Sequence, residues 1–161
     1  MKKNTGVDGF LLERKGLISI IYMGLMFISF LGYILLDNYR IGQSEHWVSI
    51  THLTQEDLQR IQELGMWISS AEYLFLGLFF LAVLLLVRYR KNRKVLNSFI
   101  LLHLCLLLAL AGLGYGLSFF LTIPFANATL PLLTPIYLLP IIVAYAIFVR
   151  FKLIGVRPPA Q

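Results

Sequence analysis

Two long apolar runs on either side of a short basic stretch constrain this chain more than any other feature of its sequence. The runs extend from Tyr73 to Val87 and from Val95 to Ile123, and five of the seven residues from Arg88 to Lys94 are Lys or Arg. About 20 apolar helical residues cross the hydrocarbon of a bilayer. A soluble core does not accommodate runs of this length, so the pattern predicts two membrane spans with a basic connection.

The composition agrees with a membrane class. Of the 161 residues, 58% are hydrophobic and 14% are charged, and the mean hydropathy is +0.78. Soluble domains carry about 25% charged residues. The net charge of +6 does not indicate nucleic-acid binding, because most of the basic residues flank apolar runs. We therefore expect residues 1–161 to form a single membrane domain whose first partner is the lipid bilayer.

Four apolar segments predict four spans, at about residues 17–36, 71–87, 96–121 and 130–149. The expected fold class is an all-α integral membrane protein, a four-transmembrane-helix antiparallel bundle. Within the last span, Thr134 and Pro135 predict an N-cap and a first helical residue. Pro140 then lies inside the helix and is expected to kink it.

The distribution of basic residues predicts the orientation. Twelve of the fourteen Lys and Arg residues lie near the termini or in the connection 88–95, and only Arg40 and Arg60 lie in residues 37–70. Loops rich in Lys and Arg stay on the cytoplasmic side. This bias predicts a multi-pass protein of the cell (plasma) membrane with both termini cytoplasmic and residues 37–70 outside.

The outer loop, residues 37–70, is expected to contain a short amphipathic helix. Thr54 and Asp57 resemble a capping box, and Leu53 and Leu58 have the spacing of a hydrophobic staple. Further apolar residues follow at helical spacing, which predicts about four turns of helix: Ile61, Leu64 and Ile68. The glycine and serines within residues 65–70 predict a bend before the second span.

One face of the third span is formed mainly by small residues at heptad spacing. Small residues let helix backbones approach closely in lipid. The preferred interpretation is packing inside the bundle, and the alternative is contact with a second copy or a larger membrane-protein partner. We call this face the seam, and besides Leu102 it comprises Ser98, Cys105, Ala109, Gly112 and Gly116. Roughly opposite lies a second set: His103, Ala111, Gly114 and Ser118.

Glu72 and His103 are candidates for an intramembrane polar site, since ionisable residues in spans are functional candidates by default. Glu72 lies near the outer hydrocarbon boundary, where a carboxylate could couple to an ion. His103 lies about two turns from the cytoplasmic end of its span and could relay protons or bind haem or a metal. The preferred interpretations are a water-exposed carboxylate and a neutral imidazole bonded to a neighbouring helix.

No motif indicates catalysis, a metal or a cofactor. A nucleophile elbow, a phosphate loop and a dinucleotide fingerprint are all absent from the sequence. The single Cys105 excludes an intramolecular disulfide. Metal-binding residue types do occur in the outer loop without the spacing of a metal site: Glu45, His46, His52, Glu56 and Asp57.

The order of four spans, with a larger first outer loop and a short second one, resembles the architecture of claudins and peripheral myelin proteins. Those families carry a Trp-Gly-Leu-Trp and Cys-Cys pattern in the first loop. Here that loop has Trp47 and Trp67 and no cysteine. The resemblance covers the arrangement of elements and implies no function.

Three functional hypotheses follow. The leading one is a small polytopic, non-enzymatic membrane protein that acts through helix–helix contacts, as an accessory subunit or a small homo-oligomer. The alternative is a small ion-coupled transporter using Glu72 or His103. The third is a membrane-embedded enzyme with an extracytoplasmic active site.

Overall fold

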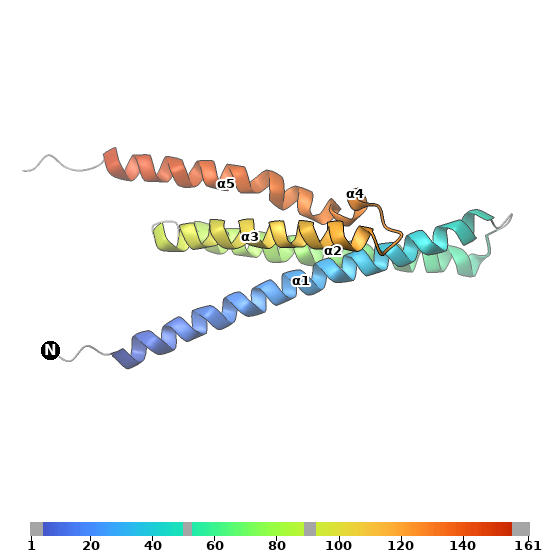
Figure 1. Ribbon diagram of the computed structural model, residues 1–161, viewed down its shortest axis with the longest axis horizontal. Helices are drawn as coiled ribbons and strands as arrows, with labels where there is room; N and C mark the ends of the chain where they lie inside the picture. Colours follow the sequence, from blue (N-terminus) through green and yellow to red (C-terminus); the bar gives the residue numbers. More distant parts are fainter. Residues whose placement is uncertain (1–4, 50–52, 89–92, 156–161) are drawn as a thin grey trace, which may run out of the picture. The chain divides into compact units, whose positions relative to one another are not determined.

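The computed structural model describes residues 5–49, 53–88 and 93–155. Over these ranges it is helical and contains no strand, which confirms the all-α class. Figure 1 shows the elements in chain order: α1 (Thr5–Ser49), α2 (Gln55–Arg88), α3 (Arg93–Ser118), α4 (Phe125–Ala128) and α5 (Leu130–Gly155).

Three of these helices are long and apolar enough to cross a membrane: the Leu17–Ser49 part of α1, all of α2, and the Val95–Ser118 part of α3. Large apolar side chains on them are exposed, among them Ile18 and Leu84. Such surfaces are unfavourable in water and suit hydrocarbon, where a helix satisfies its own backbone hydrogen bonds. The Leu130–Tyr145 part of α5 is also apolar but shorter. A membrane protein is therefore supported, and the four-helix bundle stays a prediction.

The start of α2 confirms the capping box. The backbone N–H of Thr54 donates to Asp57 Oδ2 at 3.0 Å, and the backbone N–H of Asp57 donates to Thr54 Oγ1 at 3.2 Å. The residues of the predicted bend, 65–70, do not interrupt the helix, because α2 continues without a break to Arg88. One glycine costs a helix only about 1 kcal/mol relative to alanine, too little to end it between apolar helical turns.

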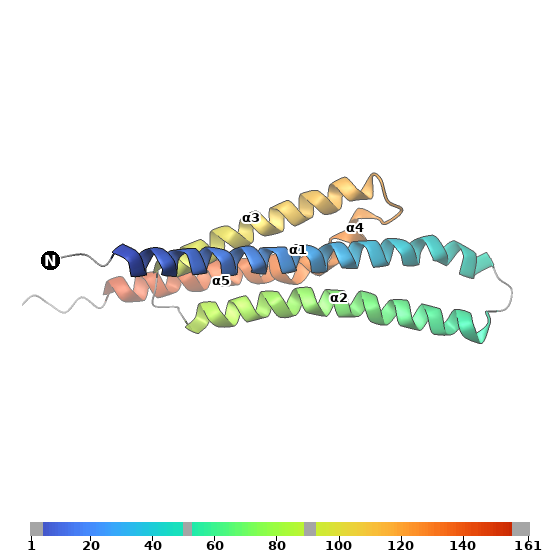
Figure 2. The same cartoon turned by 90° about the horizontal axis from the view of Figure 1, so that it is seen from below.

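Residues 37–49 were predicted as loop and are helical. α1 continues through them to Ser49, and the Ser44 hydroxyl donates to the Ile41 carbonyl at 2.6 Å. α1 and the first part of α2 run antiparallel here in both views (Figures 1 and 2). The segment 37–70 is thus built mainly from extensions of two long helices. The position of this segment outside the membrane remains a prediction.

The start of α5 also differs from the prediction. The helix begins at Leu130, so Pro135 lies inside it with Pro140, and the predicted cap at Thr134 is wrong. The Leu132 N–H donates to the Thr129 carbonyl at 2.9 Å in the first turn. A proline in the first turn loses no hydrogen bond, whereas one in the interior favours bending. Figure 1 shows α5 bent in its orange, N-terminal part.

The chain divides into two compact units, Met1–Leu78 and Phe79–Gln161. In the first unit, Phe30 of α1 and Phe75 of α2 are fully buried, with ring centroids 6.0 Å apart. In the second unit, α3 packs against α4 and α5. The buried apolar side chains of that unit include Leu106, Leu110, Ile123 and Leu132.

Candidate functional site

A buried stripe on α1 ends in a carboxylate. Its members repeat at intervals of three and one residues, which keeps them on one face of a helix: Met26, Ser29, Phe30, Tyr33, Ile34 and Asp37. Asp37 is only 1% exposed and forms an ion pair with Arg40, one turn further along α1. This pair lacks hydrogen-bond geometry, and neither carboxylate oxygen of Asp37 accepts a hydrogen bond from the described residues.

Glu72 occupies the facing stripe of α2. It lies four residues after buried Ile68 and three before buried Phe75, and is itself half-buried. Phe30 of α1 faces Phe75 of α2, and the two helices are antiparallel. One turn later in α1 and one turn earlier in α2, Tyr33 therefore lies opposite Glu72. The charged groups of Asp37, Arg40 and Glu72 all lie within electrostatic range of the Tyr33 hydroxyl. Within the first unit, these four side chains form a polar cluster between α1 and α2.

The cluster combines two carboxylates, one guanidinium and one phenol. A buried carboxylate is costly unless it is paired, and Arg40 supplies one positive charge for two negative ones. The remaining negative charge can accommodate a proton or a small cation. The sequence singled out Glu72 but missed Asp37, because the span was ended at Leu36. The signal was present, since Asp37 follows Ile34 at the interval that separates the earlier members of the stripe.

His103 lies in the second unit and has a different environment. It is 1% exposed, and its ring stacks on the Phe99 ring with centroids 3.9 Å apart. The Phe79 ring of α2 lies edge-on to it, with centroids 5.6 Å apart. Its Nδ1 lies 2.9 Å from the Phe99 carbonyl oxygen. A carbonyl can only accept, so Nδ1 carries the proton and donates. This bond is within α3 itself, and the predicted bond to a neighbouring helix stays a prediction. Aromatic packing and a local hydrogen bond account for a buried histidine here.

The seam on α3 is not buried inside the chain. Cys105 is exposed, as are Ser98, Ala109 and Gly112. A Cβ added at Gly112 or Gly116 would meet nothing within 4 Å. The described residues leave this seam uncovered, and its packing inside a four-helix bundle stays a prediction. The opposite set supplies the buried face instead, through His103 and Gly114.

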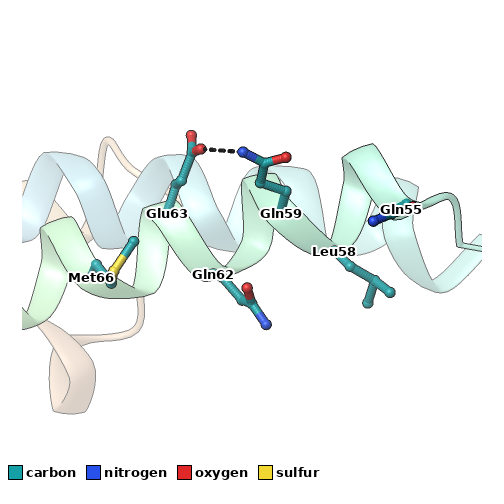
Figure 3. Close-up of a pocket in the computed structure, with 6 residues that line it drawn as sticks. All are labelled: Gln55, Leu58, Gln59, Gln62, Glu63 and Met66. Carbon is teal, nitrogen blue, oxygen red and sulfur yellow. Dashed lines mark hydrogen bonds between the residues drawn. The ribbon is translucent and has the colours of Figure 1, made fainter.

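A hollow near the start of α2 gives no enclosed site. Figure 3 shows its six lining side chains, all from this one helix, with Gln59 Nε2 donating to Glu63 Oε1 at 3.1 Å. A single helix cannot surround a ligand, since binding pockets bury most of the ligand surface. This surface is therefore a polar helix face.

The described residues contain no group of three or more His, Cys, Asp or Glu side chains that could hold a metal ion. Of the two histidines in the outer segment, His52 lies outside the described residues. No protein-family model, no curated protein and no solved structure matches this chain. The candidate sites therefore depend on the geometry of this chain alone.

Proposed function

We propose that this protein is a small polytopic membrane protein that acts through helix–helix contacts, as a homo-oligomer or as an accessory subunit of a larger membrane protein. The observation that carries the proposal is the uncovered seam of α3. Its small residues lie on a helix long enough to cross a membrane, and no described residue lies within 4 Å of a Cβ built at Gly112 or Gly116.

The physical basis is close approach of backbones. Lipid tails are as apolar as leucine, so helices associate in a membrane by packing and not by the hydrophobic effect. A glycine pair one turn apart lets a second helix approach closely enough for many dispersion contacts, each about 0.1–0.2 kcal/mol. Gly24 and Gly32 of α1 also have open space beside them, but they lie eight residues apart, whereas Gly112 and Gly116 are separated by one turn, so α3 is the proposed contact element.

The test is to fill the seam. Gly112→Leu and Gly116→Leu place side chains where a second helix would approach. The added side chains meet no described residue of the same chain at the Cβ position. We expect each variant to lower the assembled mass in size-exclusion chromatography coupled to light scattering, with an unchanged helix content by circular dichroism. An unchanged mass for both variants would mean that the seam faces lipid, and would contradict the proposal.

The proposal includes four spans with both termini in the cytoplasm, supported by the strong bias of basic residues. Single cysteines at Gln43 and Asn92, in a Cys105→Ser background, test this orientation in sealed cells. An impermeant thiol reagent should label only the cysteine at position 43. Labelling at position 92 would overturn the orientation.

The second candidate is a small ion-coupled transporter, favoured by the burial of Asp37 and by the presence of Glu72 in the same polar cluster. A bound cation raises the thermal midpoint of the state that binds it. If the cluster binds sodium, the midpoint should be higher in sodium chloride than in choline chloride of equal ionic strength. Asp37→Asn and Glu72→Gln should abolish that difference. A difference that persists in both variants would exclude the cluster as its source.

A further inference from the structure

We infer that a groove between the outer parts of α1 and α2 binds the headgroup of a zwitterionic phospholipid, an ammonium group joined through a short linker to a phosphate diester. The inference concerns a site separate from the seam. It does not depend on the protein's oligomeric state or on ion coupling.

The groove lies wholly within the first compact unit and has a volume of about 320 Å³. Tyr39, Gln43 and Trp47 line it from α1 at intervals of four residues, which places them on one face over two turns. Arg60, Glu63 and Trp67 are among the residues that line it from α2. Two helices therefore bound the groove, unlike the one-helix surface in Figure 3. Its volume falls in the range of small-ligand sites, about 300–1,000 Å³.

The lining matches both ends of a zwitterion. Aromatic faces such as those of Trp47 and Trp67 attract ammonium groups, and quaternary ammonium ligands are commonly held by aromatic side chains. The carboxylates of Asp57 and Glu63 also line the groove and add negative charge for the same group. Arg60 supplies a planar guanidinium, which suits a phosphate through paired hydrogen bonds. Arg60 and Glu63 are both exposed and so remain accessible to a ligand.

The position of the groove favours a lipid over a soluble ester. The apolar run of α1 ends at Leu36, and Tyr39 lies less than one turn beyond it. On α2, Trp67 lies just before the apolar part of the helix. Trp and Tyr concentrate at the level of lipid headgroups. A headgroup can therefore enter the groove while its acyl chains stay beside the exposed apolar faces of these helices.

Tryptophan fluorescence tests the inference directly, because Trp47 and Trp67 are the two tryptophans of the chain and both line the groove. The full-length protein in maltoside micelles is titrated with dihexanoyl phosphatidylcholine, dihexanoyl phosphatidylglycerol and free phosphocholine. We expect a saturable change with phosphatidylcholine and none at matched concentration with phosphatidylglycerol. A response to free phosphocholine of equal affinity would reassign the site to a soluble ester and overturn the lipid inference.

Three variants locate the binding. Arg60→Gln and Glu63→Gln each remove one charge that the headgroup requires, and we expect each to weaken binding about tenfold. Gln62→Ala is the matched control, since Gln62 lies between them in sequence but lines the one-helix surface and not the groove. Equal affinity in all three variants, or equal responses to both lipids, would refute the inference. Helix content by circular dichroism verifies that each variant is folded.

Discussion

The two faces of α3 both carry small residues, yet the described residues of the second compact unit cover only one of them. His103 and Gly114 lie on the covered face, beside buried Leu106 and Leu110. Cys105 and the glycines at 112 and 116 lie on the other face, with open space beside the glycines. The covered face mixes small residues with bulky leucines that fill the space between helices. The difference indicates that small residues permit close approach of a helix but do not determine which face is covered. The large side chains beside them determine that.

The largest effect should come from a matched pair of leucines on the two faces. Leu110 is 1% exposed and Leu108 is 66% exposed, two residues apart on the same helix. Leu110→Ala leaves a cavity and should destabilise the fold by about 2–5 kcal/mol. Leu108→Ala should change stability by less than about 0.5 kcal/mol. Thermal unfolding in mild detergent measures both, and equal losses would remove the distinction between the faces.

A matched pair of glycines gives the next largest effect. Gly114→Leu forces a side chain into the covered face, where overpacking costs about 1–3 kcal/mol. Gly112→Leu adds the same side chain to open space. At protein dilutions where the chain is monomeric, we expect the first variant to unfold at a lower temperature and the second to keep its thermal midpoint. At such dilutions, a lower midpoint for Gly112→Leu would mean that the seam packs against another part of the same chain.

The smallest effect should come from His103. His103→Leu removes the hydrogen bond to the Phe99 carbonyl but keeps most of the apolar contact with Phe79 and Phe99. The loss should be about 0.5–1.5 kcal/mol, the usual net contribution of one hydrogen bond. Cys105→Leu, on the exposed face, is the control and should cause no loss. Full stability of His103→Leu combined with loss of the sodium response would assign a chemical role to His103.

The sequence predicted the helical class and the start of α2 because both depend on local patterns. Long apolar runs identified the helices, and Thr54 with Asp57 identified the cap. The helical extension through residues 37–49 was missed because polar residues suggested a loop. The polar cluster was found only in part, since the burial of Asp37 depends on what packs against the far end of its stripe. The covered face of α3 could not be chosen from small residues alone, because two such sets lie on opposite sides of the helix.

The most direct test of the proposed helix contact uses the native protein. Cys105 is the single cysteine of the chain and lies exposed on the seam. In a symmetric pair of parallel helices that meet at the seam, the two Cys105 thiols come close enough for oxidation to a disulfide. The matched control is Leu104→Cys in a Cys105→Ser background, which moves the thiol about 100° around the helix to another exposed position.

Mild oxidation of native membranes, followed by non-reducing electrophoresis, is therefore the decisive measurement for self-association. The account predicts a covalent dimer through Cys105, little dimer for the Leu104→Cys control, and loss of the Cys105 dimer when Gly112→Leu is added. Dimer formation of equal extent at positions 104 and 105, or a Cys105 dimer that is unaffected by Gly112→Leu, would contradict a specific contact through the seam.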